Sequence, residues 1–274
     1  MKIGYLGPRG TFSEQAALTY TKNSSDIELV KYGTIYDVLD AVDNGEVEEC
    51  VVPLENSIEG AVTSTMDMLI FKADLFIKME IIIPVWEDFL VKTCYNGEEI
   101  AKILSHPQAL AQCAGFIRKN YPNSITVPVN STAEAARIVA ESNENIASLS
   151  PKHAAEVYGL KALHSEVQDD SSNQTRFVVV TKKRPKEKAE HAKTSIVFST
   201  QNKPGDLYRI LDIISIWDIN MTKIESRPMK HQLGSYVFFI DLEAKNLNDL
   251  ESAIKMVARK TSYFKFLGSY PVLK

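Results

Sequence analysis

Short apolar runs alternate with amphipathic stretches along the first two thirds of the chain. The apolar runs predict strands at 2–6, 27–31, 49–53, 75–85, 88–94, 102–104, 125–128, 146–149, 162–165 and 176–181. The amphipathic stretches predict helices near 12–21, 34–44, 61–71, 107–120, 132–142 and 151–158. Some of these helices begin with a capping pattern, as in Thr11 with Glu14 and Ser131 with Glu134. Strands that alternate with helices indicate an α/β domain with largely parallel sheets.

The last third of the chain has a different pattern. Residues 182–193 are densely charged around a proline and hold no side chain larger than Ala that could join a core. This segment predicts a solvated linker, with a long solvated hairpin as the alternative. Beyond it the order is strand, helix, two strands, helix and strand, at 194–201, 204–216, 218–226, 233–243, 246–259 and 263–271. This βαββαβ order is that of a small ferredoxin-like α+β module, and such modules often pair through their sheets.

The composition is ordinary for a soluble globular protein. The 274 residues are 45% hydrophobic and 24% charged, and this length suits two domains. A formal net charge of −4 and a pI near 5.8 argue against nucleic acid or an anionic membrane as the main partner. An anionic small molecule remains compatible, because local cations and helix N-termini decide its binding.

Several kinds of site are disfavoured. The three cysteines are widely spaced and the five histidines are scattered, so we expect no disulfide framework, no metal and no cofactor. Residues 4–10 match neither GxGxxG nor a P-loop, which disfavours a nucleotide site. The apolar run 75–85 is too short to span a bilayer. The chain starts as a strand rather than as a signal peptide, so we expect a cytoplasmic protein.

The most informative polar residues between a loop and a predicted strand are the pair Thr175-Arg176. It leads out of the polar loop 168–174 into the apolar run 177–180. A hydroxyl and a guanidinium therefore stand at the mouth of a buried strand, where they can act on a ligand in a cleft. Taken alone, the pair is also an ordinary strand start.

Three strand-to-helix corners, at 7–14, 52–60 and 105–112, offer further hydroxyls and amides. Each has a plain structural reading: a capped helix, a polar turn, or a histidine that holds a turn before a proline. Together with Thr175-Arg176 they predict a cleft that is rich in hydroxyls and amides and has few cations. No carboxylate pair, Cys–His pair or catalytic triad is evident. Such a site positions a polar anion and donates hydrogen bonds.

Six of these segments, in this order, resemble the motifs of a known family. Gly7–Glu14, Pro53–Ser57, Ser105–Leu110 and Thr175–Phe177 resemble prephenate dehydratase, and 203–209 and 225–228 resemble the phenylalanine-binding ACT domain that follows it. The resemblance covers essentially the whole chain. It implies a lyase of phenylalanine biosynthesis that converts prephenate to phenylpyruvate, carbon dioxide and water. Because the first strand begins at Lys2, we expect a monofunctional enzyme without a preceding chorismate mutase segment.

The resemblance also implies an architecture. Residues 1–181 are expected to form a two-lobed catalytic domain, similar to type II periplasmic binding proteins, with the active site between the lobes. One lobe would comprise 1–79 and 167–181, and the other 80–166. Residues 182–193 would be the linker and 194–274 the ACT regulatory domain. Paired ACT domains would form a homodimer or tetramer, in which phenylalanine acts as an allosteric feedback inhibitor.

Roles for individual residues follow from the same resemblance. Thr175 is the expected catalytic residue, because its hydroxyl can donate a hydrogen bond or proton to the leaving oxygen. Substrate binding is expected of Thr11, Ser13, Glu55, Asn56, Ser57, Ser105, Gln112, Arg176 and Phe177. Arg176 would either pair with a carboxylate or order the loop.

Effector binding is expected of Gly205, Asp206, Leu207, Glu225, Ser226, Arg227 and Pro228. Asp206 stands where the family usually has a small Ala. Its carboxylate would weaken an amino-acid ligand or contact the ligand's ammonium group. Alternatively, it only stabilises a helix N-terminus.

Two other functions are compatible with the sequence. A two-lobed sensor joined to an ACT module would bind an anionic ligand without turnover. Arogenate dehydratase, whose substrate differs from prephenate by an amino group, would use the same kind of cleft.

Overall fold

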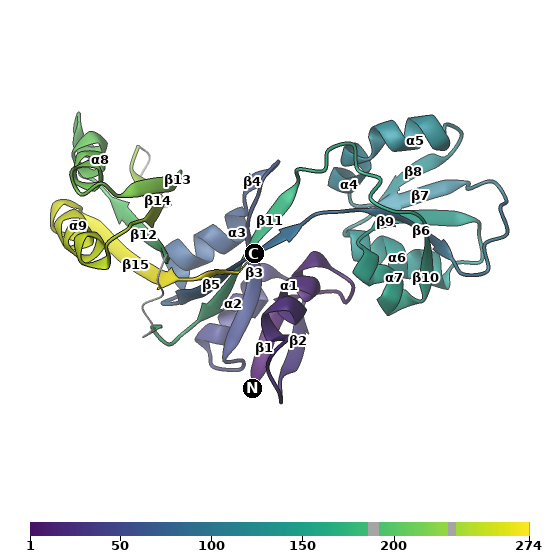
Figure 1. The fold of residues 1–274 in the computed structure, drawn as a ribbon, viewed down its shortest axis with the longest axis horizontal. Coiled ribbons are helices and arrows are strands. Elements are labelled where there is room, and N and C mark those ends of the chain that lie inside the picture. The colour runs from purple at the N-terminus through teal and green to yellow at the C-terminus, as the bar shows by residue number, and fades with distance from the viewer. Residues whose placement is uncertain (186–191, 230–233, 274) are drawn as a thin grey trace.

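Three β-sheets with their helices form an elongated molecule, with the seven-stranded sheet in the centre (Figure 1). The computed structural model describes residues 1–185, 192–229 and 234–273. Residues 186–191 of the expected linker, and residues 230–233 and 274 of the expected ACT domain, lie outside the described residues. Among the described helices, none is both long and apolar enough to span a lipid bilayer.

The seven-stranded sheet has the order β16-β5-β11-β3-β1-β2, with β4 added to β3. Its strands are β1 (Lys2–Leu6), β2 (Glu28–Tyr32), β3 (Glu49–Asn56), β4 (Gly60–Ala61), β5 (Phe76–Pro84), β11 (Gln174–Thr181) and β16 (Val272–Leu273). Its helices are α1 (Phe12–Thr21), α2 (Ile35–Asp43) and α3 (Thr63–Asp67), which continues as the π-helix η1 (Met68–Lys72). The strands β1, β2 and β3 run parallel, as expected, but β11 is antiparallel to both β3 and β5. The prediction of largely parallel sheets is therefore wrong at the centre of this sheet, where β11 is the returning strand.

The five-stranded sheet has the order β10-β6-β9-β7-β8. Its elements are β6 (Asp88–Lys92), β7 (Lys102–Ser105), α4 (Pro107–Gln112), α5 (Ala114–Asn120), β8 (Ile125–Pro128), α6 (Thr132–Glu141), β9 (Ile146–Ser150), α7 (Lys152–Tyr158) and β10 (Leu160–His164). Two crossings join this sheet to the seven-stranded one, at 85–87 and at 165–173. Since β5 continues to Pro84, the first crossing lies beyond the boundary expected after residue 79.

The helix predicted over 107–120 is interrupted at Cys113. This residue has φ −112° and ψ 15°, outside the helical range, and it separates α4 from α5. The carboxylate of Asp169 accepts hydrogen bonds from the backbone N–H groups of Gly115 (2.8 Å) and Phe116 (3.2 Å). It therefore satisfies the free donors at the start of α5, which compensates for the interruption.

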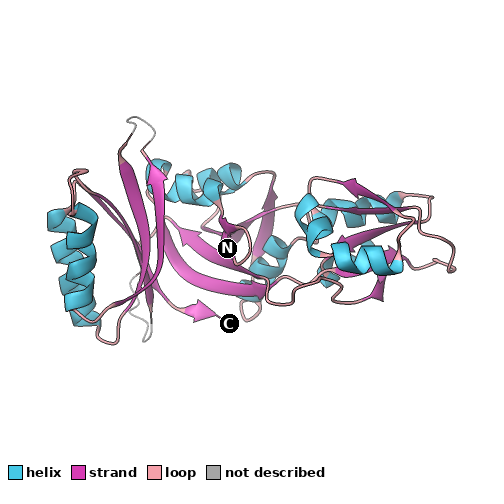
Figure 2. Cartoon of the chain, turned by 90° about the horizontal axis from the view of Figure 1, so that it is seen from above, coloured by secondary structure: helices cyan, strands magenta, loops and turns pink. Residues whose placement is uncertain are grey.

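The four-stranded sheet has the order β13-β14-β12-β15. The elements are β12 (Lys193–Ser199), α8 (Asp206–Ile216), β13 (Asn220–Pro228), β14 (Tyr236–Glu243), α9 (Leu247–Lys260) and β15 (Tyr263–Tyr270), in the predicted βαββαβ order. Both helices cover the outer face of the sheet (Figure 1), and in Figure 2 the helical layer lies on the far side of this sheet from the rest of the molecule. On this face Ile196 and Phe198 pack with Ile210 and Leu250.

The inner face of the four-stranded sheet packs on the seven-stranded sheet. Val197 and Phe239 belong to the same buried cluster as Val178 and Val180 of β11. After Pro271 the chain returns to the seven-stranded sheet, where β16 pairs parallel with β5. The two sheets thus share a core, although the charged segment between them predicted only a linker.

Gly268 provides a test of this packing. Its φ is +142°, and a Cβ at this position would lie 2.3 Å from the carbonyl oxygen of Ile77 in β5. We expect Gly268→Ala to lower the free energy of unfolding by about 1–3 kcal/mol for the backbone conformation, and by a further ~1–3 kcal/mol for the clash. Chemical denaturation measures the sum.

Gly97→Ala is the matched control for Gly268→Ala. Gly97 also has a positive φ (+95°), but a Cβ there would meet nothing within 4 Å. It should therefore show only the conformational effect. Equal losses in the two variants would contradict the close approach of β15 and β5.

Candidate active site

A cleft of about 300 Å³ lies between the seven-stranded and five-stranded sheets. From the seven-stranded side it is lined by Leu6, Thr11, Phe12, Ser13, Pro53, Asn56, Glu59, Val62 and Thr175. The first crossing contributes Val85 and Glu87, and the five-stranded side contributes His106, Gln108, Ala109, Gln112, Asn130, Ser131 and Thr132. These lining residues of the described chain include no lysine or arginine. The cleft is therefore a polar site of hydroxyls and amides, as the sequence predicted.

Thr175 is held at the cleft by Asn56. The two residues pair across β11 and β3, and the Asn56 Nδ2 group donates to Thr175 Oγ1 at 3.0 Å. The Asn56 Oδ1 atom accepts from the backbone N–H groups of Ile58 (3.0 Å) and Glu59 (3.1 Å), which fixes the orientation of the amide. Because Thr175 Oγ1 is an acceptor in this contact, its own proton is available for a group in the cleft.

Asn173 extends this network across the cleft. Its Oδ1 accepts from Asn56 Nδ2 at 2.8 Å, and its Nδ2 donates to Gln112 Oε1 at 3.0 Å. Asn173 is only 1% exposed. Sequence reasoning placed it in a polar loop and missed this role, for which the proximity to Thr175 was the only signal. Gln112 Nε2 is buried and, among the described residues, has no hydrogen-bond partner.

The start of α1 forms one wall of the cleft. Thr11 is its N-cap and accepts from the Glu14 N–H at 3.2 Å. The buried Glu14 carboxylate accepts from Tyr5 (2.8 Å) and from the Gly10 N–H (2.6 Å), and it pairs with His153 of α7 (2.8 Å). Burial alone would raise the pKa of Glu14, but these hydrogen bonds outweigh it and hold the pKa below its usual value. The pair with His153 links the two walls of the cleft at its edge.

Several residues predicted for substrate binding lie outside the cleft lining. Ser105 is fully buried and donates to the Leu149 carbonyl at 2.6 Å, and Phe177 lies in the core. Ser57 is exposed and accepts from the Gln174 N–H at 2.9 Å. Thr11, Ser13, Asn56, Gln112 and Thr175 are the predicted residues that do line the cleft.

Arg176 faces the opposite side of the sheet from Thr175, because successive side chains of a strand alternate. Its guanidinium pairs with Asp241 of β14, donates to Tyr270 of β15 at 2.9 Å, and lies 2.6 Å from Glu80. Burial alone would lower the pKa of Arg176, but Tyr270 and Asp241 raise it above its usual value. Of the two roles expected for Arg176, contact with a substrate carboxylate in the cleft is contradicted by this orientation.

Glu55 and Arg227 also connect the two sheets that share a core. Glu55, next to Asn56, forms an ion pair with Lys223 of β13 at 2.6 Å, and Arg227 donates to Asp67 at 3.0 Å. Arg227 was expected to bind an effector; within the chain its guanidinium faces the seven-stranded sheet.

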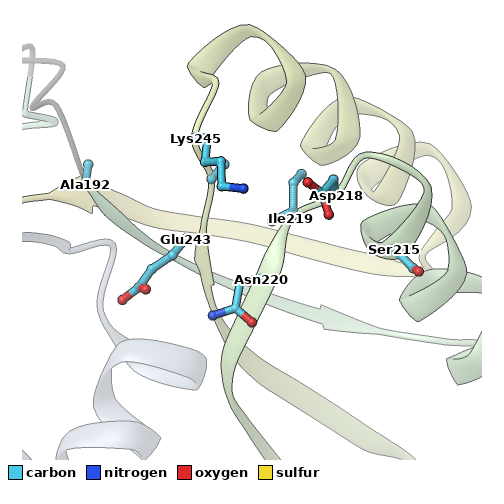
Figure 3. Close-up of a pocket in the computed structure, with 8 residues that line it drawn as sticks. Ala192, Ser215, Asp218, Ile219, Asn220, Glu243 and Lys245 are labelled. Carbon is cyan, nitrogen blue, oxygen red and sulfur yellow. The ribbon is translucent and has the colours of Figure 1, made fainter.

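The residues expected to bind an effector lie on the four-stranded unit. Gly205 has φ +81° at the start of α8, and the Asp206 carboxylate accepts from the Lys203 N–H and from Arg209, each at 3.1 Å. Asp206 is thus engaged as a helix-start residue. A separate pocket of about 470 Å³, lined by Asp218, Asn220, Glu243 and Lys245 among others, contains none of the expected effector residues (Figure 3).

Glu87 was not predicted from the sequence. It lies on the first crossing, is 2% exposed, and lines the cleft. Burial raises its pKa to about 8, and the negative charge of Asp88 adds to the rise. No group of three or more His, Cys, Asp or Glu side chains within the described ranges is placed to hold a metal ion.

Replacement of Glu87 by glutamine should change how stability depends on pH. The pKa of Glu87 is raised in the folded protein from its ordinary 4.5 to about 8. Between these two pH values the wild type therefore binds one more proton when folded than when unfolded. As the pH rises from 4.5 to about 8, its free energy of unfolding should fall relative to that of Glu87→Gln, by up to about 1.4 kcal/mol per pH unit. Urea denaturation of both proteins at about pH 5 and about pH 8 measures this. A difference that stays constant with pH would contradict it.

Comparison with known proteins identifies the family. The family model for prephenate dehydratase matches residues 3–185. The chain is 40% identical over 272 residues to the prephenate dehydratase of Methanocaldococcus jannaschii, covering 98% of this chain and 97% of that one. It is also 40% identical over 272 residues to a bifunctional chorismate mutase/prephenate dehydratase of Aquifex aeolicus, covering 99% and 74%. The crystal structure of the Arthrobacter aurescens prephenate dehydratase in complex with L-Phe matches with a TM-score of 0.89 at 30% identity, covering 99% of this chain and 90% of that one. The chain belongs to the prephenate dehydratase family of lyases.

Proposed function

We propose that prephenate is converted to phenylpyruvate in the cleft between the seven-stranded and five-stranded sheets, with Thr175 as a donor to the leaving hydroxyl. The observation that supports this most directly is the contact of Asn56 Nδ2 with Thr175 Oγ1, since it leaves the hydroxyl proton free for a ligand. The reaction breaks the C–O bond to the ring hydroxyl and the C–C bond to the ring carboxylate. The electron pair of the C–C bond completes the aromatic ring.

The cleft suits the two carboxylates of prephenate. The N-termini of α1 and α6 both reach it, through Thr11 and Ser13 on one wall and Ser131 and Thr132 on the other. Free backbone N–H groups at a helix start favour an anion. Gln112 Nε2 is a further buried donor. We assign direct binding to these groups, and we assign Glu55, Ser57, Ser105, Arg176 and Phe177 to the support of the cleft.

Two substitutions at Thr175 separate its hydroxyl from its shape. Thr175→Val keeps the branched side chain but removes the donor, and it should lower kcat for prephenate by roughly 10²–10⁴-fold. Thr175→Ser keeps the hydroxyl and should retain most of kcat. Phenylpyruvate formation in steady-state assays gives both values. Full activity of Thr175→Val would rule out the proposed role of Thr175.

The same assays compare prephenate with arogenate. We expect prephenate to be preferred, in line with the relatives named above. A larger kcat/KM for arogenate would place the chain with the arogenate dehydratases, while leaving the cleft as the active site.

The domain assignment is also part of the proposal. We assign 1–181 to a two-lobed catalytic domain, with the lobes meeting at the two crossings, 182–193 to a linker, and 194–274 to an ACT regulatory domain. The βαββαβ order of the four-stranded unit supports this, and so does the phenylalanine complex of the Arthrobacter aurescens relative.

Phenylalanine is the proposed effector of this domain, bound near the start of α8 and the end of β13. Gly205 lets the backbone approach a ligand, and alternate residues of β13, including Ser226 and Pro228, face away from the seven-stranded sheet. Leu207 and Glu225 complete the expected set, and Asp206 is available to an ammonium group only if its contacts change.

We further propose a cytoplasmic homo-oligomer in which the ACT domains pair, since β13 is an edge strand.

Lys223 gives a test of regulation through these contacts. Its ammonium pairs with Glu55, which precedes Asn56. We expect Lys223→Gln to bind phenylalanine but to reduce the effect of phenylalanine on prephenate turnover by about 5-fold or more. The reason is that the ion pair between β13, which carries expected effector residues, and β3, which lines the cleft, is lost. Calorimetry gives the binding and initial rates give the inhibition. The exposed Lys255 on α9 provides a control, since Lys255→Gln should be inhibited like the wild type.

A further inference from the structure

The reaction requires a proton that the residues assigned so far do not supply. Prephenate carries two negative charges; its products are phenylpyruvate with one charge, carbon dioxide and water. The balance therefore consumes one proton, which ends on the departing oxygen. The hydroxyl of Thr175 can donate a hydrogen bond, but giving up its proton would leave an alkoxide, which must be reprotonated by a stronger acid.

We propose that Glu87 is that acid: its buried carboxyl faces the cleft and protonates the hydroxyl that leaves prephenate. This inference rests on the proposed function of the cleft and names a further catalytic residue in it. It derives from the position of Glu87 and from the partners of its side chain.

The backbone at Glu87 is fixed on both sides. Its N–H donates to Gln168 Oε1 at 3.0 Å, and its carbonyl accepts from the Val167 N–H at 2.8 Å. The two crossings between the sheets are thus bound to each other at this residue. The carboxyl itself is different, because its Oε2 atom is buried and has no hydrogen-bond partner among the described residues. A buried polar atom without a partner at the wall of a cleft is a site for a ligand group.

The charged and titratable groups around Glu87 favour its neutral form. Asp88 follows it in the chain and adds a negative charge. Cys113 lies nearby, and the pKa of its thiol is raised first by burial and then by the charge of Glu87. Asp169 acts on Cys113 in the same direction, and Glu59 and His106 line the same cleft. None of these neighbours supplies a permanent positive charge. A neutral carboxyl at this position also avoids repulsion of a substrate with two carboxylates.

The other titratable groups of the cleft are placed differently from Glu87. Glu59 is exposed rather than buried. The Nδ1 atom of His106 accepts from the Gln108 N–H at the start of α4 and is engaged in capping that helix. A buried carboxylic acid that remains protonated near neutral pH is well matched to proton donation.

One proton passes from Glu87 to the hydroxyl that leaves prephenate. The O–H bond of Glu87 breaks and a new O–H bond forms on the leaving oxygen, while the C–O bond of the ring carbon breaks. The C–C bond to the ring carboxylate breaks at the same time, and its electrons enter the ring. Water and carbon dioxide leave, and Glu87 remains as a carboxylate. A proton from solvent restores it for the next turnover, and Thr175 holds the leaving oxygen by its hydrogen bond throughout.

The test is the pH dependence of kcat in three proteins with prephenate as substrate. In the wild type, kcat should be constant below neutral pH and should fall up to tenfold per pH unit above about 8, as Glu87 ionises. Glu87→Gln keeps the shape but carries no acidic proton, so kcat at neutral pH should fall by roughly 10²–10⁴-fold and the decline at high pH should disappear. Asp88→Asn removes a charge that disfavours ionisation, and it should move the decline to lower pH.

A second measurement does not depend on turnover. The infrared difference spectrum of wild type minus Glu87→Gln should contain the band of a protonated carboxyl at neutral pH, and this band should be lost near pH 8. Absence of the band would overturn the proposal, and so would a Glu87→Gln protein with kcat close to that of the wild type.

The outcomes separate this inference from the proposed function. If Thr175→Val is inactive while Glu87→Gln is fully active, the cleft remains the active site and the role of Glu87 is wrong. If the wild type forms no phenylpyruvate, the proposed function itself fails.

Discussion

The insertion of β11 between β3 and β5 is the constraint on which the rest of the structure depends. This strand returns from the five-stranded sheet and runs antiparallel to both neighbours over its whole length. Its first residues set the cleft, because the register places Thr175 opposite Asn56. Its later residues belong to the core shared with the four-stranded sheet. One strand therefore fixes the pairing of Thr175 with Asn56, one crossing between the two larger sheets and the surface on which the four-stranded unit packs.

The alternation of side chains along β11 assigns adjacent residues to different tasks. Thr175 faces the cleft, whereas Arg176 faces the four-stranded sheet and contacts Asp241, Tyr270 and Glu80. Glu55 and Asn56 on β3 divide in a similar way, since Glu55 pairs with Lys223. The backbone that carries Thr175 and Asn56 is thus held by ion pairs from the four-stranded unit. A shift of that unit would act on the cleft through one peptide bond.

The placement of charge explains the character of the cleft. The cations near it, Arg176 and Lys223, are engaged on the other side of the sheet, and the cleft lining within the described part of the chain has no lysine or arginine. In the proposed function, an anionic substrate would depend there on helix starts, hydroxyls and amides. The buried carboxyl of Glu87 is compatible with an anionic substrate because burial and Asp88 favour its protonated form.

The sequence predicted most of the elements, since hydrophobic periodicity and capping residues act locally. The strands β1 and β7, the helices α1 and α6 and the whole βαββαβ order agree closely with the expected ranges. Two of the differences trace to distant contacts. Asp169 caps α5 and permits the interruption at Cys113, and β5 offers an edge on which β16 adds a strand.

By itself, the sequence determined the order of the elements, the polar corners and the motifs that carry the family resemblance, because all of these depend on residues close together in the chain. Only the tertiary structure decided which face each side chain occupies and what it meets there. It placed Arg176 away from the cleft, buried Ser105 against Leu149, added Asn173 to the Thr175 network and put Glu87 on the cleft wall. These positions depend on strand register and on the crossings between sheets, where residues far apart in sequence become neighbours and burial changes their chemistry.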